Sequence, residues 1–501
     1  MGIDGFLVSV EVDISSGLPT YATVGLPDTQ VRESKDRVIA ALRNSGFDFP
    51  LNRITVNLGP AKFKKGGTHF DLPIALGILA ASGQLSKTAC SRLEKTAFVG
   101  ELSLDGTLRP AAGILPMMLA AKTSHVERVV VPRGNSEESG ASGMSSSWVE
   151  NLKALVRHLE NGAALAECSP PGLSGESALT AGDFCEVKNQ AMAKRALEIA
   201  AAGAHNVLLI GPPGAGKSML AKRFSSILPP MTNEESLEVT KIYSVCGLVH
   251  QGCLVSSRPY RNPHHTISDI ALIGGGNNSR PGEVSLSHNG VLFLDELPEF
   301  SRSSLEVLRQ PMESFEVTIS RARQSLVYPA RFSLIAAMNP CPCGYFGHPD
   351  RQCSCTPLQI QRYRSRISGP LLDRIDLHVQ LAPVKYCDWS GPATGETSQD
   401  IRRRVIKARQ AQRERLAGST TPANAFMTVS ELRSHCDLPP GGGDILESAM
   451  NTLGLSARSL DKILRVARTI ADLESCQSIK KEHLMEVIQY RCLDRGHCLV
   501  S

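Results

Sequence analysis

The residues best suited to chemistry lie in the segment HNVLLIGPPGAGKS. An apolar run, residues 207–210, leads into Gly211, and Gly216, Lys217 and Ser218 follow after four intervening positions. Glycines allow backbone N–H groups to crowd around phosphates, and the helix-like stretch that follows would point its N-terminus at the negative charge. The pattern predicts a phosphate loop in which Lys217 contacts the β- and γ-phosphates of ATP and Ser218 holds Mg²⁺. A glycine-rich turn is the alternative. The expected nucleotide contacts are Gly211, Pro212, Pro213, Gly214, Ala215, Gly216, Lys217, Ser218 and Met219.

Two acids and an amide follow strand-like runs farther along the chain. In GVLFLDELPEF, four apolar residues end in Asp295 and Glu296, which would complete the Mg²⁺ coordination sphere and polarise water for attack on the γ-phosphate. In FSLIAAMNP, a further apolar run ends at Asn339, from which an amide could orient the attacking water. Solvated strand caps and a turn-forming Asn before Pro are the alternative interpretations. Together with the phosphate loop, these residues predict ATP hydrolysis.

Two arginines are candidates for neutralising charge in the transition state. Arg374 follows a short helix-like turn in ISGPLLDRIDLHV. Arg458 begins the stretch ARSLDKILRVARTIADL, whose apolar residues recur at i, i+3 and i+4 as in an amphipathic helix. One arginine supplied across a subunit boundary and one from a helical lid would suit ATP hydrolysis. Spacing by itself assigns neither role.

Four of the fourteen cysteines lie within the fifteen residues CPCGYFGHPDRQCSC, shortly after the third apolar run. They are Cys341, Cys343, Cys353 and Cys355. Four thiolates can close a tetrahedral structural zinc site, with His348 as a possible substitute ligand. Free thiols and an iron–sulfur cluster are the alternatives. An insertion this short has no core of its own, so a bound metal would supply its stability.

The surrounding chain is organised to hold these segments in α/β domains. Residues 1–165 alternate strand-like runs such as RITVNLGPA and RVVVPRG with helical ones such as DTQVRESKDRVIAALRNSG. A stretch rich in Pro, Gly and Ser predicts a linker over 166–185. A second α/β block spans 186–384 and contains the cysteine insertion at 341–355. A helical lid follows over 385–501, and we expect its basic run IRRRVIKARQAQRERL to be a solvated helix face.

Composition indicates a globular chain without a membrane span. Its 501 residues are 42% hydrophobic and 21% charged, and the net charge of +5 is too small to indicate nucleic acid by itself. No apolar run reaches the roughly 18 residues of a membrane helix, and the N-terminus lacks the charged start and apolar block of a signal peptide. We therefore expect a cytoplasmic chain whose cysteines are reduced.

Six segments are recognisable together: the phosphate loop, NPHHTISDIALIGGG, RPGEVSLSHNGVLFLDELPEF, AAMNPCPCGYFGH, SGPLLDRIDLHV and LRVARTIADL. They resemble the ComM/YifB family of bacterial AAA+ ATPases, which is related to the ATPase subunit of magnesium chelatase, and the likeness covers almost the whole chain. The resemblance implies a hexameric DNA helicase that acts on branched or single-stranded DNA beside recombination proteins, since ComM promotes branch migration during integration of transforming DNA. It also implies that Asn339 is the sensor 1 residue, Arg374 the arginine finger and Arg458 the sensor 2 arginine.

The N-terminal domain resembles the Lon protease-type domain that is also found in the recombination protein RadA. KKGGTHFDLPIAL matches the stretch that holds the Lon serine, and GELSLDGTLRPAAGILPMMLAA matches the stretch that holds its lysine. The serine position falls on Thr68 and the lysine position on Met117. Methionine has no basic nitrogen with which to activate a nucleophile. We therefore expect no peptidase activity, and a role in assembly or DNA contact instead.

Two basic segments are candidate DNA contacts. In ESFEVTISRARQSLVYPA, strand-like runs flank Arg321 and Arg323, which predicts a β-hairpin whose basic tip contacts phosphates without reading sequence. Arg280 lies in the glycine-rich GGGNNSRPGE, between the two ATP motifs. An ordinary solvated hairpin or loop is the alternative in each case. His264 and His265 are adjacent and have no third ligand nearby, so we expect them at a helix start or in core packing.

Three functions are consistent with this chain. The first is a motor that moves branched DNA with ATP. The second is a magnesium chelatase-like motor that remodels a protein or inserts a metal, although no separate porphyrin-binding or metal-ion-adhesion domain is evident. The third is an ATP-dependent protease, which the methionine at position 117 disfavours. Stimulation of ATP hydrolysis by DNA would separate the first from the other two.

Overall fold

The structure of the chain is a computed structural model, in which the described residues are 2–169, 182–249, 254–276, 280–321, 324–383, 395–419 and 421–491. The chain forms two compact units. Unit 1 comprises Met1–Gly175 and Asn233–Ser256, and unit 2 comprises Glu176–Thr232 and Ser257–Ser501. The block 186–384, which we expected to form one α/β domain, therefore contributes an inserted segment to unit 1.

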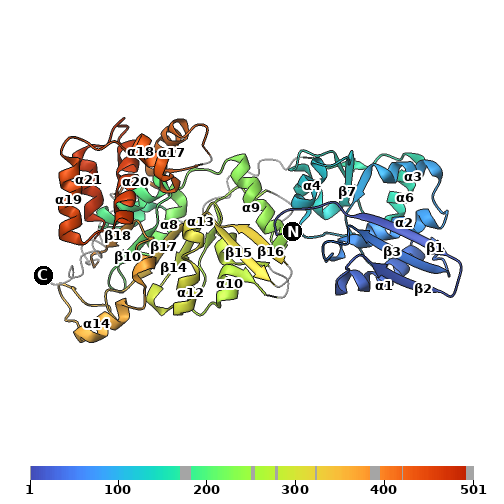
Figure 1. Cartoon of the computed structure of the whole chain (residues 1–501), viewed down its shortest axis with the longest axis horizontal. Coiled ribbons are helices and arrows are strands. Elements are labelled where there is room, and N and C mark those ends of the chain that lie inside the picture. The colour runs from blue at the N-terminus through green and yellow to red at the C-terminus, as the bar shows by residue number, and fades with distance from the viewer. Residues whose placement is uncertain are drawn as a thin grey trace. The chain divides into compact units, whose positions relative to one another are not determined.

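Unit 1 is built on two main β-sheets and a small hairpin (Figure 1). The strands are β1 (Ser9–Ser15), β2 (Thr20–Val24), β3 (Arg53–Gly59), β4 (Thr96–Phe98), β5 (Glu101–Leu102), β6 (Leu108–Arg109), β7 (Arg128–Pro132), β8 (Ser146–Val149) and β9 (Ala166–Glu167). One sheet has the order β1-β3-β2, the other has the order β4-β7-β8-β9, and β5 pairs with β6. In β3 the side chains of Ile54, Val56 and Leu58 alternate into the core, as expected for a strand with one buried face.

Most helices of unit 1 pack on these sheets. The helices are α1 (Thr29–Asn44), α2 (Asp71–Ala81), α3 (Lys87–Glu94), α4 (Ile114–Lys122), α5 (Ser136–Gly140), α6 (Leu152–Asn161) and α9 (Asn233–Cys246). The last of them, α9, packs on α4. Helix α1 begins after Asp28, whose carboxylate accepts the N–H of Val31 at 2.9 Å and so satisfies one unpaired donor of the first turn. Helix α2 is apolar almost throughout and is buried, because no face of it suits water.

Helix α9 comes from the middle of the chain but packs within unit 1. The carbonyl of Ser244 accepts the N–H of Gly113 at 2.9 Å, and the Ser244 hydroxyl donates to the carboxylate of Glu138. Glu138 is buried and also accepts the N–H of Leu115, at the start of α4, at 3.0 Å. A buried carboxylate needs such donors, so these contacts anchor the inserted helix at a defined position.

Unit 2 is organised around a five-stranded parallel sheet. Its strands are β10 (Val207–Ile210), β11 (Tyr260–Arg261), β14 (Val291–Leu294), β17 (Ser333–Met338) and β18 (Leu377–Gln380). The order is β11-β14-β17-β10-β18. Every residue of β10, β14 and β17 is buried, which is typical of a parallel sheet covered on both faces. Because the carboxyl ends of parallel strands share one edge, the segments that follow β10, β14 and β17 meet there.

Short helices and two hairpins connect these strands. The helices are α7 (Ala191–Gly203), α8 (Lys217–Ile227), α10 (Asp269–Ile273), α11 (Glu283–Leu286), α12 (Arg302–Val307), α13 (Pro311–Ser314), α14 (Pro357–Arg364) and α15 (Gly369–Leu372). The hairpins are antiparallel pairs, β12 (Gly274–Gly275) with β13 (Arg280–Pro281) and β15 (Glu316–Arg321) with β16 (Gln324–Pro329). The second hairpin is the one that the sequence predicts.

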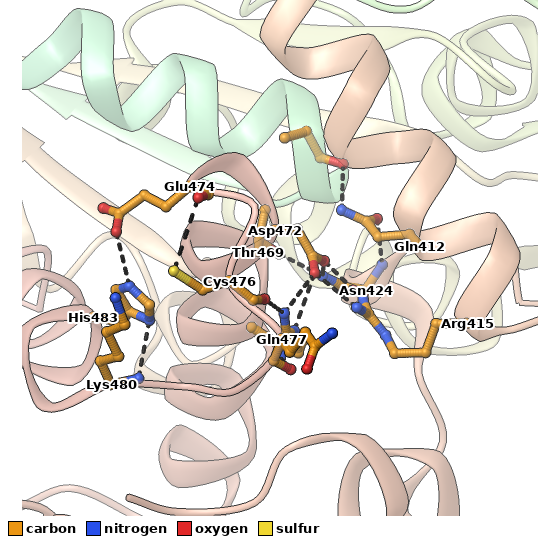
Figure 2. A network of polar contacts seen from close by, with 12 residues as sticks. Gln412, Arg415, Asn424, Thr469, Asp472, Glu474, Cys476, Gln477, Lys480 and His483 are labelled. Atoms are coloured by element: carbon orange, nitrogen blue, oxygen red, sulfur yellow. Dashed lines mark hydrogen bonds and ion pairs between the residues drawn. The ribbon is translucent and has the colours of Figure 1, made fainter.

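The C-terminal part of unit 2 is the helical region expected after residue 385. Its helices are α17 (Ser398–Arg415), α18 (Val429–His435), α19 (Gly442–Leu453), α20 (Ala457–Leu473) and α21 (Lys481–Gln489). A buried polar network joins α17 and α20 around Asp472, whose carboxylate accepts Arg415 at 2.7 Å and Arg468 at 2.8 Å (Figure 2). Thr469 of α20 also contacts His205, which follows the C-terminus of α7, with 2.8 Å between Oγ1 and Nε2. These contacts hold α20 against the part of unit 2 that contains the parallel sheet, here called the sheet domain.

Helix α17 has a solvated basic face in part, since Arg403, Lys407 and Arg413 are exposed as the sequence predicts. The helix also packs against α7, where two of its other arginines find acceptors. Arg404 contacts the carboxylate of Glu198 at 2.5 Å, and Arg409 donates to the carbonyl of Ala201 at 2.8 Å. At 18 residues α17 is the longest described helix, and neither it nor any other helix in the described part of the chain is long and apolar enough to cross a bilayer.

Candidate active site

The segment after β10 forms an open glycine loop at the carboxyl edge of the parallel sheet. Gly214 and Gly216 have φ values of +79° and +86°, and a Cβ added at either would meet no atom within 4 Å. Backbone of this kind leaves space for phosphates next to its N–H groups. Helix α8 begins at Lys217 and directs its N-terminus to the same space. The loop therefore has the form that the sequence predicts for a phosphate site.

Lys217 lies at the centre of this site. Its Nζ donates to the carbonyls of Gly211 and Pro212, at 2.7 and 2.9 Å, and to Oδ1 of Asn339 at 2.9 Å. Burial lowers the pKa of Lys217, while the charges of Asp295 and Glu296 act in the opposite direction. The structure thus brings the lysine and the amide that follows β17 into direct contact, although 122 positions separate them.

The two acids that follow β14 lie at the same edge. The hydroxyl of Ser218 donates to Oδ2 of Asp295 at 2.7 Å, and the other carboxylate oxygen accepts the N–H of Glu296 at 3.0 Å. A hydroxyl and a carboxylate are hard oxygen ligands of the kind that Mg²⁺ prefers, so this donor set fits ATP bound with magnesium. Glu296 has φ +52° and ψ +47°, a left-handed conformation that costs a non-glycine residue about 1–3 kcal/mol and is concentrated at functional sites.

His265 is a neighbour of this site that sequence reasoning missed. Its Nδ1 lies 3.5 Å from Oε2 of Glu296, and its ring lies beside that of His264 with 4.1 Å between centroids. The expectation of a helix start or core packing is wrong. Helix α10 begins only at Asp269, and His264 is exposed. The position follows from the parallel pairing of β11 with β14, which brings the segments after both strands to one edge.

The arginines predicted to neutralise charge, Arg374 and Arg458, lie together in unit 2. Nη2 of Arg374 is 2.7 Å from one carboxylate oxygen of Glu313, and Nη2 of Arg458 donates to the other. The side chain of Arg374 is 9% exposed, whereas that of Arg458 is 53% exposed. No motif in the sequence marks Glu313, which lies in α13 between the acids that follow β14 and the hairpin of β15 and β16.

The four cysteines gather into one cluster, here called the cysteine knuckle (residues 341–355). All four Sγ atoms lie within 4.8 Å of one another, and the Sγ atom of Cys341 is 3.3 Å from that of Cys343 and 3.7 Å from that of Cys353. Four thiolates at zinc–sulfur distances of about 2.3 Å would lie roughly 3.8 Å apart, so the donor set fits a tetrahedral zinc ion. His348 is outside the group, and its Nδ1 accepts the N–H of Asp350 at 3.0 Å.

The cysteine knuckle packs directly on the phosphate loop. A Cβ added at Gly344 would lie 2.6 Å from Cδ of Pro213. On the other side, Arg364 of α14 donates to the carbonyl of Pro340 at 3.2 Å, next to the amide residue Asn339. The knuckle is thus in a position to stabilise two parts of the site at once, the phosphate loop and the segment that carries Asn339.

Comparison with known proteins gives matches along nearly the whole chain. Profiles described as "Subunit ChlI of Mg-chelatase", "Magnesium chelatase, subunit ChlI" and "Magnesium chelatase, subunit ChlI C-terminal" match residues 10–135, 183–388 and 395–491. The competence protein ComM of Haemophilus influenzae is 44% identical over 99% of this chain and 96% of its own length. The chain belongs to the ComM/YifB family of magnesium chelatase-like AAA+ proteins. The YifB proteins of Escherichia coli and Salmonella typhimurium are 42% and 43% identical, each over 99% of this chain and 96% of its own length.

The basic segments of this ComM/YifB chain lie on the two hairpins of unit 2, which contact each other. A Cβ added at Gly274 of β12 would lie 3.0 Å from Cδ1 of Ile319 in β15. Arg280, at the start of β13, is exposed. Arg321 ends β15 at the tip of the other hairpin, but its side chain and the whole of Arg323 are outside the described residues.

Unit 1 holds a cavity of about 700 Å³ near the positions compared with the Lon dyad. Met117 of α4 and His69 line it, together with mainly apolar side chains from α2 and β4. Burial lowers the pKa of His69 to about 4, so this imidazole is neutral at pH 7. Thr68 begins the short 3-10 helix that precedes α2 and is not among the lining residues. The Lon-like assignment of this unit stays a prediction.

Proposed function

We propose that the chain is an ATP-hydrolysing motor that assembles with further copies into a hexameric ring and moves branched or single-stranded DNA in the cytoplasm. Its role would be branch migration during recombination of transforming DNA, in the company of recombination proteins. The observation that carries the proposal is the similarity to a competence protein over nearly the full length of the chain. The geometry agrees with it, because the predicted ATP motifs meet at one edge of the sheet.

The geometry supports a division of labour in ATP hydrolysis. Lys217 would bind the β- and γ-phosphates, and Ser218 and Asp295 would hold Mg²⁺, which neutralises phosphate charge when bound. Glu296 would take a proton from the attacking water, with His265 fixing the direction of its carboxylate. Asn339, next to the ammonium of Lys217, would orient the same water.

The paired hairpins support a DNA-binding surface made of Arg280, Arg321 and Arg323. Phosphate contacts by such cations release counterions, so binding should weaken with salt. Changing Arg321 and Arg323 together to Ala should reduce the slope of log K against log salt by about 1.4–1.8. The control is Arg403→Ala, which removes a 74% exposed cation from α17 and should leave the slope unchanged. An unchanged slope in the double variant would remove the hairpin from the DNA interface.

The cysteine knuckle supports a structural zinc ion held by Cys341, Cys343, Cys353 and Cys355. The ion would stabilise an insertion that has no core and that packs against the phosphate loop. Metal analysis of purified protein should find about one zinc per chain. Less than half that amount would contradict the assignment.

The decisive experiment measures ATP-driven migration of a synthetic mobile DNA junction by the parent and by Glu296→Gln. Strand exchange by the parent and its loss in the variant would support a branch-migration motor. ATP turnover without DNA stimulation and without junction movement would instead favour a motor that remodels a protein or inserts a metal, the function suggested by the magnesium chelatase matches. We propose no peptidase function for unit 1. Degradation of casein by the parent protein, if the Lys217→Ala variant lost it, would overturn that view.

A further inference from the structure

Glu313 joins the two arginines, Arg374 and Arg458, here called the arginine pair. Its Oε2 lies 2.7 Å from Nη2 of Arg374, and its Oε1 accepts a hydrogen bond from Nη2 of Arg458. Burial raises the pKa of Glu313, but the hydrogen bond from Arg374 and the charges of the arginine pair outweigh it and hold the pKa below its ordinary value. One ionised carboxylate therefore faces two guanidinium groups.

Arg374 is a fixed donor. Its Nε donates to the carbonyl of Arg309 at 3.2 Å and its Nη1 to the carbonyl of Pro370 at 2.5 Å, in addition to the contact with Glu313. A guanidinium carries five N–H groups, so these three contacts leave it capacity for a further acceptor. Its position is set by backbone groups and not by the solvent.

Arg458 depends on Glu313 for its direction. The helix that carries it is held to the sheet domain, because Lys462 contacts Asp376 at 3.0 Å and Arg491 donates to the hydroxyl of Ser459 at 3.3 Å. The Arg458 side chain is nevertheless 53% exposed. A long exposed side chain explores many rotamers unless a partner holds it.

The surroundings of the pair favour an anion. A hollow of about 360 Å³ is lined by Glu306, Arg309, Gln310, Glu313, Ser314 and Arg374. Glu306 and Arg309 neutralise each other at 2.6 Å. Glu313 then balances one of the two charges of the arginine pair, which leaves one positive charge beside the hollow. Guanidinium forks match phosphate oxygens in geometry as well as charge.

The arginine pair lies at the opposite edge of the parallel sheet from the phosphate loop of the same chain. The carbonyl of Arg374 accepts the side-chain N–H of Asn206 at 3.1 Å, and Asn206 immediately precedes β10. The phosphate loop begins where β10 ends, and four strand residues span roughly 13 Å. The phosphate that reaches the pair must therefore come from another molecule.

We infer that Glu313 is a positioning residue that holds the arginine pair as one receptor for the terminal phosphate of ATP bound by a second copy of the chain. This inference rests on the proposed function. Without the carboxylate, the two guanidinium groups repel each other and Arg458 turns to solvent. With it, the two guanidinium groups are held close together, each on a different oxygen of the same carboxylate.

The test mixes two variants of the full chain. Lys217→Ala removes the cation of the phosphate loop and keeps the arginine pair, whereas Glu313→Gln keeps the phosphate loop and loses the positioning carboxylate. Each variant by itself should hydrolyse ATP at least about tenfold more slowly than the parent, given what an arginine at a transferring phosphate contributes. Their mixture should exceed the mean of the two, because Lys217→Ala copies present an intact pair to ATP held by Glu313→Gln copies.

A mixture no more active than that mean would overturn the inference, since damage to folding alone is not repaired by mixing. Glu313→Gln should lower kcat with little change in KM. Glu447→Gln, which makes the same substitution at an exposed acid of α19, is the matched control and should behave as the parent. Where Glu313→Gln does not fold, Glu313→Asp keeps the charge and takes its place.

Parent protein without ATP turnover would overturn the proposed function and this receptor with it. An active parent matched by Glu313→Gln would overturn the receptor only.

Discussion

Acid should weaken unit 2 through the buried His205, at the junction between the sheet domain and α20. Burial lowers the pKa of His205 from 6.5 to about 4, and the nearby carboxylate of Asp376, 3.8 Å away, offsets this only in part. The unfolded chain therefore binds a proton between these two pKa values that the folded chain does not. Stability is complete above the unfolded pKa and is lost as the pH falls towards 4.

The loss works out at about 1.4 kcal/mol for each pH unit in this window, or about 2 kcal/mol on going from pH 7.5 to pH 5. His205→Gln keeps an amide near Thr469, which contacts the imidazole at 2.8 Å, but removes the titration. In calorimetry, the transition of unit 2 should fall between these pH values by about 3–6 °C more in the parent than in the variant. His125→Gln, which changes an exposed histidine of unit 1, is the control. Equal losses in the parent and in His205→Gln would refute the reasoning.

Three further predictions concern the ATP site, the buried network around Asp472 and the cysteine knuckle. Glu296→Gln should retain ATP affinity in a nucleotide titration but release phosphate about 100-fold more slowly or worse, since it removes the proposed general base. Unchanged turnover would exclude Glu296 from that role. Asp472→Asn leaves the guanidinium groups of Arg415 and Arg468 without their shared counter-ion. In denaturant titration, the free energy of unfolding should therefore fall by about 3–5 kcal/mol. A fall of less than about 1 kcal/mol would mean that solvent replaces the network. Cys343→Ser should lower the zinc content of the protein and its affinity for ATP together, because the knuckle packs on the phosphate loop. Loss of zinc without loss of ATP affinity would show that the knuckle does not support the phosphate loop.

Several parts of this protein could be predicted from local sequence. The strand, glycine loop and helix around Lys217 follow each other without interruption, so their geometry depends on neighbouring residues. A bound phosphate requires backbone N–H donors and a helix N-terminus, and this order of elements supplies both. The same holds for the hairpin of β15 and β16 and for the amphipathic α20, whose periodicities are visible in short windows. The cysteine spacing likewise marked a compact cluster before its distances were known.

Features that depend on contacts between distant segments could not be predicted in this way. A salt bridge such as that of Glu313 with the arginine pair needs no fixed spacing, and a single acid in α13 looks like any exposed acid of a short helix. The sequence does not reveal the position of His265 for the same reason, since the pairing of β11 with β14 brings it to Glu296. Part of the basic face of α17 packs against α7, because α7 supplies acceptors for Arg404 and Arg409 that the sequence does not reveal.

The sequence by itself thus determined the residues that we propose to bind ATP and a metal, because those candidate sites are built from short contiguous segments with demanding chemistry. Tertiary structure decided which of these residues act together. It placed the residues that follow β10, β14 and β17 at one edge of a parallel sheet, and the arginine pair at the other. It also assigned α9 to unit 1, where the buried carboxylate of Glu138 requires the hydroxyl of Ser244 as a donor.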